Sequence, residues 1–356
     1  METASSPAST GFIVGVDIGG SKIAAGLVLP TGEIRYHTRV PMLPNDGAAA
    51  GLATVLKAID QVCAKAASSG CKHELSGIGI CCPGPLDPQT GVIVNPPNLP
   101  CWRNFPLADE ISRKYKVPVK VDNDANAAAL AEVLWGAGRG YRNVFLTILG
   151  TGIGTGIVFD GRIYHGRTGA AGEGGHVSID YRGPLCGCGK PGCIEAFAAG
   201  PAIAKRARAK LNAVDMKESA LLRLAHGECG NVTAEMVGEA YAQGDPVAAE
   251  TLRETVALLS LWLGNMIDLL EPDVIILGGG VADLMKPFLG EIRGLLPGCC
   301  VNRRCQEIPL LPAFYGGDAG IAGGAALAAD AVSAKTLEPE TDLGQFESVS
   351  PSDRGL

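Results

Sequence analysis

The sequence has 356 residues, of which 47% are hydrophobic and 19% charged, so it can bury a core and is not a disordered chain. It carries 30 basic and 37 acidic residues, a formal net charge of −7, and only 5% aromatic residues. An acidic chain without basic runs and with few aromatic residues is not expected to bind nucleic acid. No apolar run reaches the roughly 18 residues that cross a bilayer, and the N-terminus does not read as a signal peptide. We therefore expect a cytoplasmic protein with no membrane partner.

The first half of the chain predicts three consecutive strands followed by alternating helices and strands. Apolar, strand-length runs begin at Phe12, Lys22 and Glu33, most simply as an antiparallel meander. A helix is predicted over residues 48–70, a buried strand from Leu75, a second helix from Leu107, a strand ending at Asp124, and an alanine-rich helix over residues 125–138. The βββαβα order, rather than simple βα alternation, indicates the fold class.

The second half repeats the pattern more loosely. Three strands with glycine turns are predicted between residues 143 and 166, an irregular stretch from 166 to 192, and helices from Ile194 to about Leu270. A strand at 273–280, a helix at 281–296, a short strand from Ile308 and an alanine-rich helix complete the pattern. Residues 1–10 are expected to be flexible, and the polar, acidic segment 334–356 is expected to be a disordered tail.

Two glycine-rich turns lie between paired strands, one at Asp17–Lys22 (DIGGSK) and one at Gly150–Gly156 (GTGIGTG). Backbone N–H groups in such turns can face an anion without obstruction, and the hydroxyls of Ser21, Thr151 and Thr155 can add hydrogen bonds. The second turn leads into a hairpin and not a helix, which argues against a dinucleotide-binding motif. Two ordinary hairpin turns are the alternative, but their equivalent places in a duplicated pattern favour paired phosphate loops.

The twelve cysteines are mostly expected to be small buried apolar residues, with one exception. Cys186, Cys188 and Cys193 lie within eight residues, separated by glycines, and His176 precedes them by ten residues. A Cys3His set is typical of a closed, structural zinc site, whereas a reactive or disulfide-forming patch is the alternative. Such a zinc ion is expected to brace Glu173 and Glu195. The second ring nitrogen of His176 then needs a partner, for which a substrate hydroxyl is suitable.

The segment Asp122–Asn126 (DNDAN) is predicted at a strand end that opens a helix. Capping the helix or forming the turn is the favoured role for Asp122. Asp124 differs, because a hydroxyl that accepts a phosphoryl group needs a positioned carboxylate as its base, and a strand end facing a cleft suits that role.

The strand order and the paired loops resemble the actin-like (hexokinase/Hsp70-type) ATPase fold, an α/β architecture of two lobes with an interlobe cleft for nucleotide. The resemblance implies that Asp17 faces magnesium or phosphate and that Gly278–Gly280 lie on the adenosine side, although a plain strand-to-helix turn is the alternative for these glycines. The expected ATP-binding residues are Asp17, Gly19, Gly20, Ser21, Lys22, Thr151, Gly152, Gly154, Thr155, Gly278, Gly279 and Gly280.

Eight segments in order, DIGGSK, PGP, NPPNLPCW, DNDANAAALAE, LGTGIGTGIV, GEGGHVSID, CGCGKPGCIE and LGGGVAD, resemble the ROK family (repressors, open reading frames, kinases) over about residues 12–330. The resemblance implies a small lobe over 11–125, completed by about 314–333, and a large lobe with the zinc site over 126–313. It implies ATP with Mg²⁺, and Asp124 as the base on a sugar 6-hydroxyl. The sugar-binding residues that it implies are Gly84, Asn98, Asn123, Asp124, Glu173, His176 and Glu195. Ser21 departs from the usual threonine but keeps the hydroxyl.

Phosphorylation of glucose at its 6-hydroxyl by ATP is the first expectation from this resemblance. Kinases of N-acetylmannosamine, N-acetylglucosamine, fructose or allose share the motifs, and polyphosphate is an alternative donor. Repressors of the family carry a DNA-binding domain ahead of the kinase-like body, whereas only about ten residues precede the first strand here. A non-catalytic sugar-sensing regulator is less expected, because Asp124 and both loops are intact. Family likeness suggests a homodimer or homotetramer.

Overall fold

The structure is a computed structural model that describes residues 11–42, 45–71, 73–213 and 219–337. The N-terminus at residues 1–10 and the segment 338–356 lie outside the described residues. The last described helix, α11 (Ala319–Leu337), includes the first four residues of the segment predicted as a tail.

The first half builds a five-stranded sheet in the order β3-β2-β1-β4-β7. Its strands are β1 (Phe12–Ile18), β2 (Lys22–Val28), β3 (Ile34–Pro41), β4 (Leu75–Cys82) and β7 (Val119–Asn123). The first three pair antiparallel, as the meander predicts, and β4 and β7 join in parallel. Around this sheet lie α1 (Ala48–Ser68), α2 (Leu107–Tyr115) and a small hairpin of β5 (Leu86–Asp87) and β6 (Val92–Ile93).

The second sheet has the same topology, in the order β10-β9-β8-β11-β12. Its strands are β8 (Val144–Leu149), β9 (Ile153–Phe159), β10 (Arg162–Ile163), β11 (Val274–Gly278) and β12 (Leu310–Pro312). Again the first three pair antiparallel and the last two join in parallel. The duplication expected from the sequence is therefore present at the level of strand order.

Most of the remaining helices come after β10 in the chain and belong to the second half of the molecule. They are α4 (Glu195–Ala198), α5 (Gly200–Ala213), α6 (Ala220–Leu224), α7 (Ala234–Ala242), α8 (Pro246–Leu270), α9 (Gly280–Met285) and α10 (Leu289–Leu295). Short 3-10 turns occupy Gly174–His176, Cys229–Asn231, Lys286–Phe288, Leu296–Gly298, Cys305–Glu307 and Gly316–Asp318. The single helix predicted over residues 281–296 is thus divided, because Pro287 lacks the N–H that would continue α9.

Two helices cross between the halves of the molecule. The helix α3 (Asp124–Trp135) follows β7 of the first sheet but packs on β8 and β9 of the second, while α11 follows β12 and packs on β1 and β4. The two helices also pack against each other. Glycines permit the close approach of α11, since a Cβ on Gly79 would lie 1.7 Å from the carbonyl oxygen of Gly324.

Both crossings are tied to one buried carboxylate, Glu132 of α3, which is 1% exposed. Its Oε1 accepts hydrogen bonds from the N–H groups of Phe314 and Tyr315 at 2.8 and 3.2 Å, and its Oε2 accepts one from Ala137 at 2.7 Å. The two segments in which the chain passes between the lobes are therefore hydrogen-bonded to the same side chain, Glu132.

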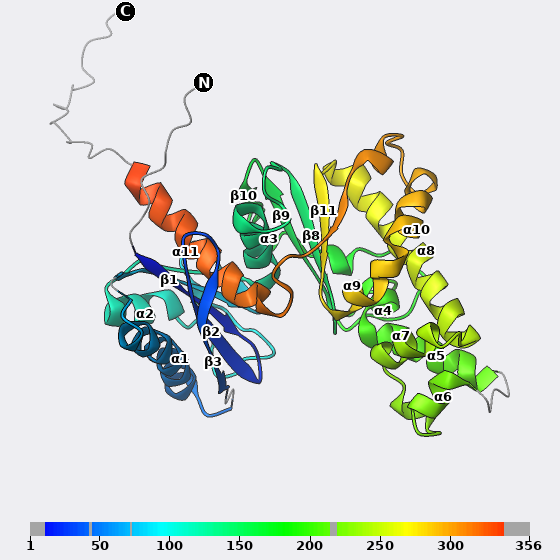
Figure 1. Ribbon diagram of the computed structural model, residues 1–356, viewed down its shortest axis with the longest axis horizontal. Coiled ribbons are helices and arrows are strands. Elements are labelled where there is room, and N and C mark those ends of the chain that lie inside the picture. The colour runs from blue at the N-terminus through cyan, green and yellow to red at the C-terminus, as the bar shows by residue number, and fades with distance from the viewer. Residues whose placement is uncertain (1–10, 43–44, 72, 214–218, 338–356) are drawn as a thin grey trace, which may run out of the picture.

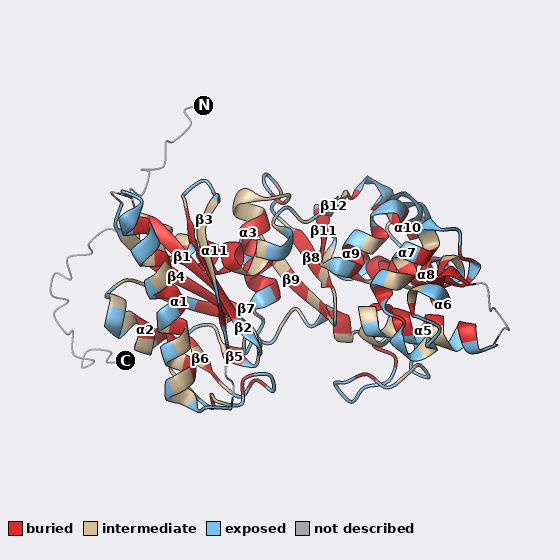
Figure 2. Cartoon of the chain, turned by 60° about the horizontal axis from the view of Figure 1, so that its bottom comes forward, coloured by how far each residue is buried: buried red, intermediate tan, exposed pale blue. Residues whose placement is uncertain are grey.

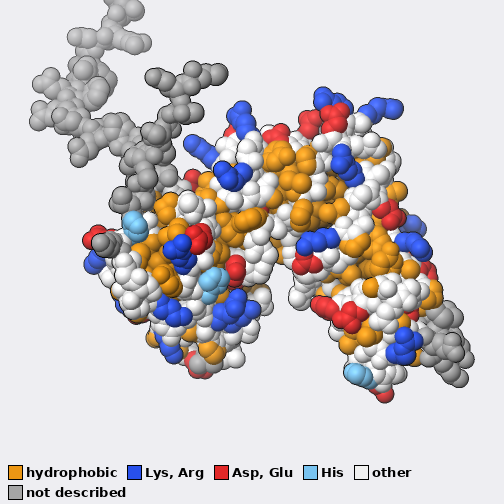
Figure 3. Space-filling view, viewed as in Figure 1, with side chains coloured by type: hydrophobic (Ala, Val, Ile, Leu, Met, Phe, Trp, Pro, Cys, Tyr) orange, Lys and Arg blue, Asp and Glu red, His pale blue; other side chains and the backbone are white. Residues whose placement is uncertain are grey.

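Each sheet has its own apolar core, shown by the buried strands of Figure 2. Trp102 is fully buried in the first core and Trp262 in the second. In the space-filling view of Figure 3 the surface is hollowed between the two lobes. The fold is thus the two-lobed α/β arrangement that the sequence predicts.

Candidate active site

The turn that joins β7 to α3 carries the predicted base. Asn123 caps the helix, because its Oδ1 accepts hydrogen bonds from the N–H groups of Ala125 (2.9 Å) and Asn126 (3.4 Å). Asp124 opens the helix, and its Oδ1 accepts from the N–H of Ala125 at 2.8 Å. Asp122 does not cap: it is buried, and its Oδ2 lies 2.6 Å from Nε2 of His165. Of the two roles predicted for Asp122, helix capping is not found, whereas its Oδ1 holds the turn by accepting hydrogen bonds from the N–H of Asn123 and from Nδ2 of Asn126.

Three predicted carboxylates approach one another around Asp124. Asp124 is exposed, but the protein groups around it partly desolvate its carboxyl and raise its pKa, and the charges of Asp17 and Glu173 raise the pKa further. Burial also raises the pKa of Asp17, against the opposing effects of Cys81 and Lys22. The structure thus places Asp17, Asp124 and Glu173 in one electrostatic environment, although they come from three separate segments.

The first glycine turn is built on its neighbours. The N–H of Gly19 donates to the carbonyl of Lys22 at 2.9 Å, and a Cβ on Gly20 would lie 3.0 Å from the carbonyl oxygen of Asn98. Ser21 and Lys22 are exposed. The exposed Asn98 therefore belongs to a loop that packs directly on the turn.

Two residues that the sequence did not single out hold Asp17. The Cys81 thiol lies 3.5 Å from Oδ1 of Asp17 and 3.2 Å from the carbonyl oxygen of Gly320, with geometry suited to donation to either. A Cβ on Gly320 would lie 2.4 Å from Cγ of Asp17, so the start of α11 closes over this carboxylate. The sequence predicts Cys81 only as an apolar strand residue, because its role depends on a contact with Gly320, 239 residues away.

The second glycine turn opens onto a pocket of about 460 Å³ in the large lobe. Thr151 and Gly280, both predicted to bind nucleotide, line it together with Gly150. Sequence reasoning missed its other lining residues, which come from α5, α7, α9 and the loop before α7: Gly200, Pro201, Ala204, Arg208, Val232, Thr233, Ala234, Glu235 and Val281. Val281 directly follows the predicted Gly278–Gly280, whereas the others carry no glycine-rich or acidic motif that would have indicated them.

The later residues of that turn serve the fold. Gly154 and Gly156 lie within β9, and a Cβ on Gly156 would stand 2.4 Å from the carbonyl oxygen of Ala125, so this glycine admits α3. Thr155 is buried, and its hydroxyl donates to the carbonyl of Gly172 and accepts from the N–H of Gly174. The hydroxyl predicted to bind phosphate is therefore used inside the protein, where it shapes the segment carrying Glu173.

The ligand atoms of His176, Cys186, Cys188 and Cys193 all lie within 4.8 Å of one another. The sulfur atoms of Cys188 and Cys193 are 3.7 Å apart, and Nδ1 of His176 is 3.6 Å from the sulfur of Cys186. A tetrahedral zinc ion with Zn–S bonds of about 2.3 Å and a Zn–N bond of about 2.0–2.1 Å needs S–S edges near 3.8 Å and an N–S edge near 3.6 Å. The four residues therefore fit a zinc ion.

The cluster is joined to two predicted sugar ligands. Oε1 of Glu195 lies 3.9 Å from Nδ1 of His176, and its Oε2 accepts a hydrogen bond from the N–H of Ile153 at 2.9 Å. On the other side of the ring, Nε2 of His176 lies 4.0 Å from Oε2 of Glu173. The N–H of the Trp262 indole donates a hydrogen bond to the carbonyl of Gly174 and so supports the segment that carries Glu173 and His176. His176 therefore has one nitrogen toward the cysteines and the other toward Glu173.

The remaining predicted glycines occupy distinct positions. A Cβ on Gly84 would meet nothing within 4 Å, so this residue borders open space. Gly278 ends β11, and Gly279 has a φ of 91° with Leu149 so close that a Cβ would lie 2.4 Å from its carbonyl oxygen. A Cβ on Gly152 would lie 2.6 Å from Oε2 of Glu195, so this glycine allows the turn to contact Glu195 beside the cysteine–histidine cluster.

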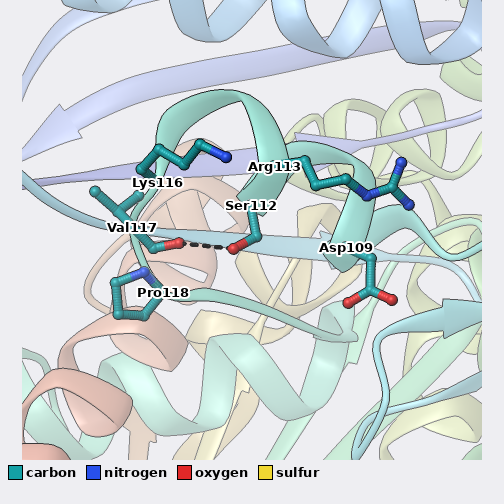
Figure 4. Close-up of a pocket in the computed structure, with 6 residues that line it drawn as sticks. All are labelled: Asp109, Ser112, Arg113, Lys116, Val117 and Pro118. Carbon is teal, nitrogen blue, oxygen red and sulfur yellow. Dashed lines mark hydrogen bonds between the residues drawn. The ribbon is translucent and has the colours of Figure 1, made fainter.

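A further pocket of about 500 Å³ lies at the C-terminal end of α2, away from these residues (Figure 4). It is lined by Asp109, Ser112, Arg113, Lys116, Val117 and Pro118, and the Ser112 hydroxyl donates to the carbonyl of Val117 at 3.2 Å. None of the residues predicted to bind nucleotide or sugar borders it. Among the described residues, no helix is both long enough and apolar enough to cross a membrane.

Two sheets of identical topology, crossing helices and a glycine turn in each lobe define the actin-like ATPase fold. The chain matches the ROK family over residues 13–331 and belongs to it. It is 37% identical to a glucokinase of Halalkalibacterium halodurans, covering 88% of this chain and 93% of the relative. A crystal structure of a ROK glucokinase from Streptomyces griseus in complex with glucose and AMPPNP is similar with a TM-score of 0.74 and 35% identity, covering 90% of this chain and all of that one.

The family also includes proteins with another role. A ROK transcriptional regulator homologous to the Escherichia coli MLC protein is similar with a TM-score of 0.79 at 28% identity, covering 92% of this chain and 79% of the regulator. The fold alone therefore does not separate kinases from regulators, whereas the relatives at higher identity are sugar kinases. The protein is a glucokinase-like member of the ROK sugar kinases.

Proposed function

We propose that this protein transfers the γ-phosphoryl group of ATP to the 6-hydroxyl of a hexose, with glucose as its preferred substrate. The observation that carries the proposal is the position of Asp124 at the start of the crossing helix α3, close enough to Asp17 and Glu173 for their charges to raise its pKa. Relatives named as glucokinases over nearly the whole chain support glucose as the acceptor.

In the proposed reaction, Asp124 accepts the proton of the sugar hydroxyl while the hydroxyl oxygen bonds to the γ-phosphorus and the bond to the β-phosphate oxygen breaks, releasing ADP. A raised pKa makes the ionised carboxylate a stronger base without a residue change. Asp17 faces the magnesium ion or the phosphates, and the pocket of Thr151 and Gly280 receives the nucleoside side. Asn98, Asn123, Glu173, His176 and Glu195 are assigned to the sugar hydroxyls, and Gly84 to the edge of that site.

The zinc ion has a structural role in this proposal. Four protein ligands leave no position for a reacting water, so the ion supplies rigidity to the segment that carries Glu173, His176 and Glu195. The contact of Glu195 with the N–H of Ile153 extends that support to the second glycine turn. The metal therefore links the proposed sugar wall to the proposed nucleotide pocket.

The experiment that tests the function is a coupled assay of ADP release with ATP and Mg²⁺ over a panel of hexoses. The panel contains glucose, mannose, fructose, allose, N-acetylglucosamine and N-acetylmannosamine, with polyphosphate as a second donor. The highest kcat/KM is expected for glucose with ATP. A preference for an N-acetylated sugar would overturn the glucose assignment, and no turnover with any sugar would overturn the kinase assignment.

A sugar-responsive regulator is the second candidate, favoured by the likeness to the ROK transcriptional regulator. The two functions differ in the reaction, because a regulator needs to bind sugar but not to transfer phosphate. Sugar binding by calorimetry with no turnover in the panel would support the regulator.

A further inference from the structure

The pairing of Asp122 with His165 joins the two lobes immediately behind the catalytic turn. Asp122 lies in β7 of the first sheet, and His165 follows β10 at the edge of the second sheet. The Asp122 side chain is 5% exposed, and its Oδ2 lies 2.6 Å from Nε2 of His165. Because the two residues belong to different lobes, the contact exists only when the lobes are assembled.

The other carboxylate oxygen of Asp122 holds the turn itself. Its Oδ1 accepts hydrogen bonds from the N–H of Asn123 at 2.7 Å and from Nδ2 of Asn126 at 3.2 Å. Asn123 is the cap of α3, and Asp124 stands between these two anchored residues. The orientation of Asp124 is therefore fixed by a carboxylate whose own position is set by a histidine of the other lobe.

The environment of His165 allows solvent to reach this pair. A cavity of about 390 Å³ is bordered by both residues, and the His165 side chain is 35% exposed. The other charged groups that face the cavity are Lys120 of β7, Arg162 of β10 and Asp330 of α11. The hydrogen bond to Asp122 raises the pKa of His165, against the effects of burial and Lys120. Protonation of the imidazole therefore strengthens its hydrogen bond to the Asp122 carboxylate.

We propose that His165 is a positioning residue of the phosphoryl transfer, which holds Asp122 from the opposite lobe and thereby fixes the orientation of Asp124. This inference rests on the proposed function. His165 does not touch the reacting atoms, so its loss lowers kcat and leaves the binding of hexose and ATP nearly unchanged. A less well oriented Asp124 can still accept the proton. We therefore expect kcat to decrease by about 10–100-fold, less than on removal of the base itself.

The test compares His165→Leu with His165→Gln in the full-length protein. Glutamine places an N–H₂ group near the position of Nε2 and cannot ionise, so it is expected to restore kcat to within about 3-fold of the unmodified protein. His165→Leu is expected to lower kcat with KM for both substrates within about 3-fold. Lys120→Gln is the matched control, because Lys120 borders the same cavity but makes no hydrogen bond or ion pair with Asp122 among the described contacts.

One further readout separates positioning from general destabilisation. Amide hydrogen exchange of the segment 119–130 is expected to be faster in His165→Leu and normal in His165→Gln. Unchanged kcat together with unchanged exchange in His165→Leu would overturn the proposal. If no hexose is phosphorylated by the unmodified protein, the proposed function fails, while the exchange measurement still decides whether His165 fixes the turn.

Discussion

The two lobes share a strand order but place different groups at equivalent strand ends. In the first sheet, Ile18 pairs with Ile23 at the turn, and Asp17 precedes Ile18. In the second sheet, Leu149 pairs with Ile153 at the turn, and the residue that precedes Leu149 is Ile148. The small lobe thus presents a carboxylate where the large lobe presents an apolar side chain.

The strand ends that lead into the crossing helices differ in the same way. β7 runs directly into α3, so that Asp124 is both the end of the strand connection and the first helical residue. β12 is followed by a loop before α11, and the acid there, Asp318, forms exposed ion pairs with His37 (3.5 Å) and Arg39 (3.6 Å). One duplicated plan therefore places two carboxylates, Asp17 and Asp124, at strand ends of the small lobe, where the large lobe has the apolar Ile148 and the partly exposed Asp318.

The largest expected effect comes from the pair Asp124→Asn and Asp318→Asn, which remove the acids at the two crossings. We expect Asp124→Asn to lower kcat by about 10³–10⁴-fold, because amide nitrogen and oxygen cannot accept the hydroxyl proton. Glucose affinity measured by calorimetry should change little. Asp318→Asn should keep kcat within about 2-fold, since exposed ion pairs contribute little. Near-normal turnover of Asp124→Asn would refute its role as base.

The next effect concerns the zinc cluster, which only the large lobe carries among the described residues. Cys188→Ser should lose bound zinc and lower the thermal midpoint by about 5–10 °C, because metal binding stabilises only the folded lobe. Elemental analysis and calorimetry measure both quantities. Cys71→Ser, a cysteine of the small lobe outside the cluster, serves as the control. An unmodified protein without zinc would contradict the assignment.

A smaller effect distinguishes the two ends of the second glycine turn. Gly156→Ala should destabilise the protein by about 1–3 kcal/mol, because the added Cβ would lie 2.4 Å from the backbone oxygen of Ala125. Gly150→Ala meets open space, so the fold should keep its stability while KM for ATP rises. Urea unfolding and steady-state kinetics measure the two outcomes. Equal stability of the two variants would mean that α3 does not need the close contact.

The smallest effect is a shift in pH dependence. Asp124 must be ionised to act as base, and its pKa is raised, so kcat/KM should fall on acidification at a higher pH than an unshifted aspartate would give. Removing the negative charge of Glu173 with Glu173→Gln lowers the pKa of Asp124, so the acid limb should move to lower pH. The pH at which kcat/KM falls to half of its plateau gives the position of the acid limb, and this pH does not depend on the value of the plateau. An unmoved limb would show that the two carboxylates do not interact.

Local sequence signals were sufficient for much of the fold and part of the site. Strand-length apolar runs and glycine turns determine where each strand begins, because side-chain alternation and turn chemistry depend on neighbouring residues only. The spacing of Cys186, Cys188 and Cys193 indicated the metal cluster for the same reason. The resemblance to the ROK family then supplied the fold class, which the comparisons confirm.

Other features were decided only by the tertiary structure. Which sheet each crossing helix covers, the burial of the Thr155 hydroxyl, the α5 and α7 residues of the pocket, and the contact of His165 with Asp122 all join segments far apart in the chain. No local pattern records such contacts, because they arise from packing between faces whose neighbours are set by the whole fold. The sequence by itself determined the elements, the motifs and the metal ligands. The tertiary structure decided which of those residues face the cleft and which hold the protein together.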